Sequence, residues 1–240
     1  MGNKITLKRM VLILTTIVLI GLFSCGNHDN TFEQPVLEES ETKDYSITLS
    51  TARDYVDLAL PSGTKWANMN VGASSNADPG GYYMWGETTE FSKAKYTFQD
   101  SVTYEYMNIG RDISGTKYDV ARVLWGEGWK MPTLEQYIEL CQYCDYGEYS
   151  LSGHSGYVFV GRNGNRIFMP SGGCLQITGS VMYYPYYEDL RTIELYDPHE
   201  HYYWSSSDNI EYDSQAWCWH NLGRYNMGRE FGCNVRAIKE

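Results

Sequence analysis

The stretch Gly128-Trp129-Lys130-Met131-Pro132-Thr133 decides how the middle of this 240-residue chain is interpreted. Gly128 allows a backbone turn at no steric cost. Pro132 suits the approach to a helix, because its φ is fixed and it has no N–H. Thr133 is the expected N-cap, and Gln136, three residues further on, completes a capping box. The stretch therefore predicts a helix that begins after Thr133.

The expected helix, residues 133–144, has one apolar face. Its apolar positions recur at helical spacing: Leu134, Tyr137, Ile138 and Cys141. Most of the chain after residue 50 consists instead of short β-forming runs separated by turn residues. We therefore expect an α+β fold, in which short twisted antiparallel strands and hairpins gather around this one main helix, with long irregular loops.

Several hairpins fit that pattern. Asn163-Gly164 between two apolar runs is the strongest short hairpin signal in the chain. A second hairpin is expected across the turn at residues 61–64. Three strand candidates close the chain, at residues 201–206, 216–222 and 232–238. Three segments are expected to be irregular loops: residues 88–117, 147–156 and 174–200.

The N-terminus has the three-part order of a secretory signal. Three basic residues precede an apolar run over residues 10–23, which is too short for a comfortable membrane span. The run ends in Leu22-Phe23-Ser24-Cys25, which resembles a bacterial lipobox. Cys25 is therefore the expected lipid attachment residue.

Composition divides the chain into three regions. Residues 1–24 are the expected lipoprotein signal peptide. Residues 25–50 are acidic with few large apolar side chains, which predicts a flexible tether. Residues 51–240 contain no second linker and no internal repeat, which predicts a single domain.

The mature chain is strongly acidic. Removing residues 1–24 takes away three of the 19 basic side chains and none of the 30 acidic ones, which leaves a net charge of −14. Such a surface repels nucleic acid and anionic lipid headgroups. We therefore expect no nucleic-acid partner, and a lipid anchor as the attachment to the membrane.

Seven sequence blocks occur in an order that resembles a bacterial domain family. They are residues 55–67, Asn70-Val71-Gly72-Ala73, Trp85-Gly86-Glu87, residues 128–133, residues 163–170, residues 203–207 and Val235-Arg236. In this order they resemble the Fibrobacter succinogenes major paralogous domain, which is abundant in lipoproteins of Bacteroides-type bacteria.

The resemblance covers residues 54–238. It implies a C-type-lectin-like fold in an outer membrane lipoprotein, on the cell surface or the periplasmic face. It implies no established activity, and its blocks are expected to be scaffold. Accordingly, four Trp side chains are expected in the core: Trp66, Trp85, Trp129 and Trp204.

A non-catalytic recognition domain for a glycan or protein ligand is the leading hypothesis, because binding residues concentrate on irregular segments held by a rigid scaffold. The candidate ligand surface consists of Tyr183, Tyr184, Tyr186, Tyr187, Tyr203, His199 and His201. Two alternatives remain open. One is a structural component of the envelope or a surface fibre, and the other is a cysteine-dependent oxidase by fold analogy with formylglycine-generating enzymes.

No cofactor is expected. The calcium-binding sequences of C-type lectins are absent from the chain. His199 and His201 point the same way on an extended segment and could contribute metal ligands, with a third from His154 or His220. A polar loop explains the pair equally well, so we predict no metal site.

Six cysteines, less the lipid-bearing one, leave five, an odd number. Export to an oxidising compartment permits disulfides. If a hairpin centred on Tyr225-Asn226 joins the last two strands, Cys218 and Cys233 face each other and form a possible disulfide. Cys174 is the competing partner.

Overall fold

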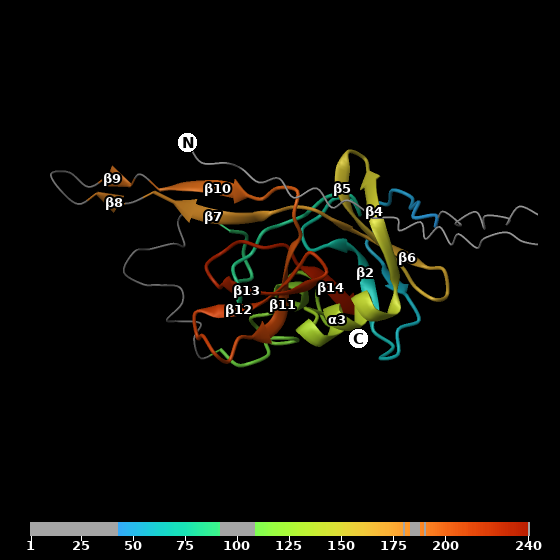
Figure 1. Cartoon of the computed structure of the whole chain (residues 1–240). Coiled ribbons are helices and arrows are strands. Elements are labelled where there is room, and N and C mark those ends of the chain that lie inside the picture. The colour runs from blue at the N-terminus through green and yellow to red at the C-terminus, as the bar shows by residue number, and fades with distance from the viewer. Residues whose placement is uncertain (1–42, 92–108, 180, 183–187, 190, 240) are drawn as a thin grey trace, which may run out of the picture. The chain divides into compact units, whose positions relative to one another are not determined.

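The computed structural model describes residues 43–91, 109–179, 181–182, 188–189 and 191–239 (Figure 1). They belong to one compact unit, Lys43–Glu240. Cys25, the expected lipid attachment residue, lies outside the described residues, and so does most of the expected tether.

The end of the expected tether, residues 43–50, packs against this unit. Lys43 pairs with Asp145 at 2.7 Å. The Asn76 side chain donates a hydrogen bond to the Thr48 carbonyl at 2.9 Å. Residues 43–50 therefore belong to the same compact unit as the rest of the described chain.

The described residues contain two helices and fourteen strands. The helices are α2 (Val120–Trp125) and α3 (Leu134–Tyr143). The strands are β1 (Tyr55–Asp57), β2 (Lys65–Asn70), β3 (Trp129–Lys130), β4 (Asp145–Leu151), β5 (His154–Val160), β6 (Arg166–Pro170), β7 (Cys174–Thr178), β8 (Val181–Met182), β9 (Glu188–Asp189), β10 (Thr192–Tyr196), β11 (Tyr202–Asp208), β12 (Gln215–His220), β13 (Gly223–Gly228) and β14 (Arg236–Lys239).

The expectation of an α+β fold around one main helix is wrong, because the structure is mostly β. Antiparallel pairing gives a sheet of order β1-β2-β14-β3, sheets β11-β12-β13 and β4-β5-β6, and the two-stranded pairs β10-β7 and β8-β9. The sequence led to the wrong class because strand pairing joins residues far apart in the chain, and a local window does not contain it.

Two of the three expected loops contain strands. The segment 174–200 includes the β7–β10 ribbon, which runs out from the rest of the unit in Figure 1. The segment 147–156 lies in the β4–β5 hairpin, whose turn is Ser152-Gly153. Both turn residues have positive φ, 50° and 86°, as a two-residue type I′ turn requires. Most of the third segment, residues 88–117, lies outside the described residues.

The predicted helix entrance is confirmed. Thr133 caps α3, and the capping box with Gln136 has both of its hydrogen bonds. Gly128 has φ +86°, a conformation that other residues rarely adopt. Trp129 and Lys130 form the short strand β3, which pairs with β14.

The predicted apolar face of α3 is only partly right. Leu134, Tyr137 and Leu140 are buried, whereas Ile138 is 38% exposed. Tyr137 stacks on Trp219 of β12 with ring centroids 5.6 Å apart. The helix therefore packs against the β11-β12-β13 sheet through this aromatic contact.

The four Trp side chains expected in the core are confirmed there: Trp66, Trp85 and Trp204 are fully buried, and Trp129 is nearly so. Trp219, which the blocks did not indicate, joins them. The Trp204 Nε1 donates a hydrogen bond to the Tyr83 carbonyl at 2.7 Å.

A buried polar network ties the blocks together. Arg236 has no exposed surface and donates to Asn70 Oδ1 at 2.7 Å, to the Ala67 carbonyl at 2.8 Å and to the Phe168 carbonyl at 2.6 Å. Burial lowers the pKa of this guanidinium. Because Asn70 also donates to the Tyr203 hydroxyl at 3.0 Å, one network joins β2, β6, β11 and β14.

Neither described helix is long and apolar enough to cross a membrane.

Candidate functional site

A groove of about 650 Å³ lies between the β4–β5 hairpin and the segment that leads into β11. The hairpin contributes Glu148, Tyr149 and Tyr157 to its wall. The opposite wall includes His199, Glu200, His201 and Asn221. Two neighbouring strands and two turns therefore bring aromatic rings, carboxylates and imidazoles to one opening.

His201 is a buried residue of this groove, with 4% of its surface exposed. Its ring stacks on Tyr157, with centroids 4.6 Å apart and planes 25° apart. Burial lowers the pKa of His201 to about 4. The imidazole is therefore neutral near pH 7.

The hydrogen bonds of His201 fix its tautomer. Nε2 lies 3.1 Å from the Met169 carbonyl, which only accepts, so Nε2 carries the proton. Nδ1 then carries a lone pair, and among the described residues it is buried with no hydrogen-bond partner. An unpaired buried acceptor is destabilising, and because this atom has almost no accessible surface, a ligand in the groove does not contact it.

Tyr157 lies between two carboxylates. Burial raises the pKa of its hydroxyl, and the nearby charges of Glu148 and Glu200 raise it further. Glu148 is the direct cross-strand neighbour of Tyr157, so the two side chains leave the same face of the sheet. The opening therefore has a negative rim around an aromatic surface.

The β12–β13 turn holds the far wall. Asn221 and Leu222 have φ of 44° and 66°, the left-handed pair that a two-residue hairpin needs. The Asn221 amide donates to Glu200, and the Asn221 Oδ1 accepts from the His201 backbone N–H at 3.4 Å. This turn thereby fixes the position of the Glu200 carboxylate.

The candidate residues expected from sequence separate into three groups. His199 and His201 line the groove, although His201 lies at its base rather than on an open surface. Tyr203 was wrongly expected at the ligand surface, because it is fully buried and its hydroxyl donates to the Pro170 carbonyl at 2.7 Å. Tyr183, Tyr184, Tyr186 and Tyr187 lie outside the described residues.

The hairpin that was expected to bring Cys218 and Cys233 together is wrong, although the two thiols do lie side by side. The last hairpin turns at Asn221-Leu222, so Cys218 pairs across the ladder with Tyr225, not with Cys233. Cys218, Cys233 and Cys174 nevertheless share one buried core, and all three are free thiols. Burial raises the pKa of Cys233 well above its usual value, and the adjoining Cys218 thiol raises it further.

No group of three or more His, Cys, Asp or Glu side chains within the described part of the chain is arranged to hold a metal ion. The pair His199 and His201 does not provide two free imidazoles, because His201 uses Nε2 for the Met169 carbonyl.

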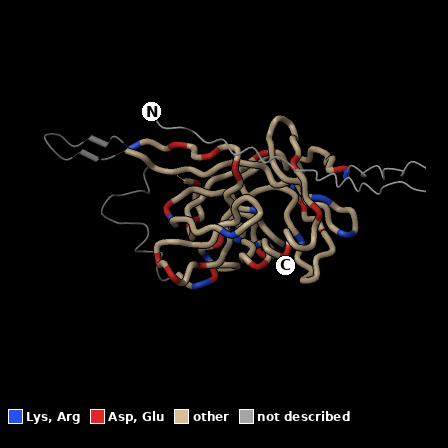
Figure 2. Tube along the Cα trace, in the orientation of Figure 1, with Lys and Arg blue, Asp and Glu red and all other residues tan. Residues whose placement is uncertain are grey.

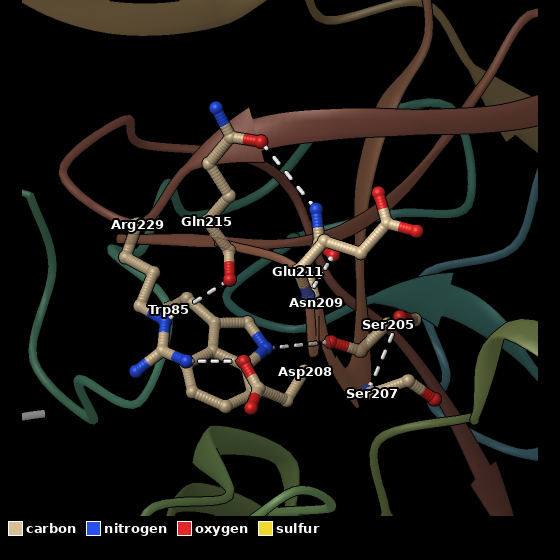
Figure 3. Close-up of polar contacts among 8 residues, drawn as sticks. All are labelled: Trp85, Ser205, Ser207, Asp208, Asn209, Glu211, Gln215 and Arg229. Atoms are coloured by element: carbon tan, nitrogen blue, oxygen red, sulfur yellow. Dashed lines mark hydrogen bonds and ion pairs between the residues drawn. The ribbon is translucent and has the colours of Figure 1, made fainter. Parts of the chain in front are cut away.

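A second polar cluster surrounds Arg229 (Figure 3). The guanidinium lies 4.3 Å from the Trp85 ring centroid, pairs with Asp208 and donates to the Gln215 carbonyl at 3.2 Å. Burial raises the pKa of Asp208, whereas the Arg229 charge lowers it. Since these groups satisfy one another inside the fold, the cluster anchors the β11–β12 loop and is the weaker candidate for a ligand site.

The groove contains residues that the sequence analysis missed, above all Glu148 and Tyr157. Glu148 belongs to the segment 147–156, which was expected to be a loop, and Tyr157 directly follows that segment. The available signal was the Ser152-Gly153 dipeptide between two segments rich in Tyr and Ser, since such a dipeptide favours a tight hairpin turn.

No protein-family model, no curated protein and no solved structure matches this chain. The groove's own geometry is therefore the basis for the functional argument.

Proposed function

We propose that this chain is an outer membrane lipoprotein, anchored through lipid on Cys25, whose domain is a non-catalytic recognition module for a glycan or protein ligand. It faces the cell surface or the periplasm. The sequence blocks support membership of the Fibrobacter succinogenes major paralogous domain family. In this proposal those blocks build the scaffold, and the groove between β4–β5 and residues 199–201 binds the ligand.

The observation that carries the proposal is a groove of ligand size in which the Tyr157 ring meets the Glu148 and Glu200 carboxylates. Ligand sites are concave, with apolar walls and a few directed polar groups. Here Tyr157 supplies aromatic surface, and Glu148 and Glu200 supply hydrogen-bond acceptors. These carboxylates can accept hydrogen bonds from a ligand. Glu148 and Tyr157 lie on β4 and β5, and the opposite face of these strands packs against Tyr45 and Ile47.

Thiol chemistry favours this proposal over the cysteine-dependent oxidase. A reactive thiol needs a lowered pKa and access to solvent. Burial instead raises the pKa of Cys141 to about 11 and the pKa values of Cys144 and Cys174 to about 12. These thiols are protonated near pH 7 and are poor nucleophiles.

The test uses residues 43–240, which form one compact unit with its own cores. Glycan and extracellular-matrix protein arrays are probed with this domain, with and without calcium. Each positive is repeated with Tyr157→Ala, which removes one wall of the groove, and with Tyr212→Ala, which removes an exposed ring outside it. The proposal expects binding that Tyr157→Ala abolishes and Tyr212→Ala leaves intact, and an array without any positive would refute it.

A further inference from the structure

On the side of the β4-β5-β6 sheet that carries Glu148 and Tyr157, Phe159, Ile167 and Met169 pack into the core, and the groove is the part of this face that stays open. On the opposite face, Tyr45 and Ile47 pack against the cluster that contains Val158 and Phe168. The Tyr45 ring also occupies the space beside Gly147, because a Cβ there would lie 2.5 Å from it. A ligand of this sheet therefore has access through the face that carries Glu148 and Tyr157.

Strand β4 is an edge strand. Among the described residues it has a main-chain partner on one side only, which is β5. An unpaired edge presents alternating N–H and C=O groups, on which an extended segment can form an added strand. Glu148 and Ser150, which line the groove, lie in the middle of this edge.

The charged side chains beside this edge indicate which kind of peptide segment can pair with it. Glu148 belongs to β4, and Glu200 faces it from the other wall of the groove. The lining residues of the groove include no Lys or Arg. A second copy of this acidic chain would bring like charges to the same edge, which is unfavourable across a strand pair. Acidic and basic positions are interspersed along the described chain (Figure 2), so the negative rim is a local feature.

We propose that the groove binds an extended segment of a basic partner protein, which adds a strand to β4 and places a Lys or Arg side chain between Glu148 and Glu200. This inference rests on the proposed function, since it names the ligand class of the same groove.

Geometry supports the placement of the cation. A residue of the added strand that lies opposite Glu148 projects from the same face as Glu148 and Tyr157. Cross-strand neighbours on one face are about 5 Å apart, within reach of a long side chain. The ammonium or guanidinium group then contacts both carboxylates and the Tyr157 ring, as cations do at aromatic faces.

The experiment measures binding of fluorescein-labelled heptapeptides of alternating Thr and Lys to residues 43–240 by fluorescence anisotropy. Parallel probes replace Lys by Glu, replace Lys by acetyl-lysine, or carry N-methyl groups at alternate residues. A glucosamine oligomer, which has amines but no peptide edge, is the final probe. We expect saturable binding of the Lys peptide only, weakened by added salt and lost on N-methylation.

Glu148→Gln is the matched variant, because it keeps the side-chain shape and removes the charge. We expect it to weaken binding about fivefold, as the loss of a partly exposed ion pair does. Glu194→Gln removes a carboxylate from an exposed strand outside the groove and should leave binding unchanged. Circular dichroism of both variants checks that the fold is retained.

Three outcomes would overturn the inference. The first is binding of the Glu peptide as tight as that of the Lys peptide. The second is an equal effect of Glu148→Gln and Glu194→Gln on binding of the Lys peptide. The third is binding that survives N-methylation of the peptide, or binding of the glucosamine oligomer in place of the Lys peptide. If the arrays identify a groove ligand without a cationic group, this inference fails and the proposed function stands. If no ligand depends on Tyr157, both fail.

Discussion

Lowering the pH should destabilise this protein through His201. The pKa of His201 is about 4 in the folded chain, against an ordinary value of 6.5, because burial disfavours the imidazolium. Each unit of pKa difference corresponds to about 1.4 kcal/mol, so the protonation of this side chain opposes folding by about 3 kcal/mol.

The sign follows from proton uptake. Between pH 6.5 and about 4 the unfolded chain binds a proton at this position and the folded chain does not. The contribution of neutral His201 is therefore fully present above pH 6.5 and is lost as the pH falls towards 4. The groups that act on its charge are Glu200, which favours the imidazolium, and His220, which opposes it.

The assay is urea unfolding of residues 43–240 at half-unit steps from pH 7.5 to 4, for wild type and His201→Gln. Gln keeps a donor for the Met169 carbonyl but does not titrate. Other titrating groups contribute to both proteins, so the difference between the two pH profiles isolates His201. We expect wild type to lose about 3 kcal/mol more than the variant over this range. Parallel profiles would refute the buried, neutral placement of His201.

Three further predictions concern the scaffold. Arg236→Met leaves Asn70 Oδ1 and two main-chain carbonyls without their donor, and since each costs about 1–3 kcal/mol, urea unfolding should show a loss of at least about 3 kcal/mol. A loss below about 1 kcal/mol would contradict the network. Thr133→Ala removes the α3 cap and should cost about 1 kcal/mol, while Thr133→Ser keeps the hydroxyl and most of that stability. Iodoacetamide at pH 8 should leave Cys174 and Cys233 unlabelled in the folded domain and label both in urea, as mass spectrometry can report; labelling of either in the native state would contradict their burial.

Local sequence signals were reliable where the interactions themselves are local. The capping box at Thr133 joins residues three apart, and the Asn163-Gly164 turn joins neighbouring strands, so both were visible in a short window and both are present. The Trp positions in the blocks were also correct, because a large ring beside small residues has few places to lie except the core.

The strand content of the chain was underestimated for a different reason. Segments such as β7 and β10 are short alternations of apolar and polar residues within a longer irregular stretch, and their pairing with each other makes them strands. The hairpin expected at Tyr225-Asn226 was also wrong, because the turn lies at Asn221-Leu222. Both turn residues have positive φ although neither is a glycine, so the sequence gives only a weak turn signal there.

By itself, the sequence determined the acidic charge, the helix start at Thr133 and the Trp residues of the core, because these depend on composition or on near neighbours. Only the tertiary structure decided which polar residues meet. Tyr203, expected at the surface, became a buried link to Asn70, whereas Glu148 and Glu200, 52 positions apart in the sequence, came to face one groove. Such convergence depends on strand pairing over long chain separations, which no local pattern encodes.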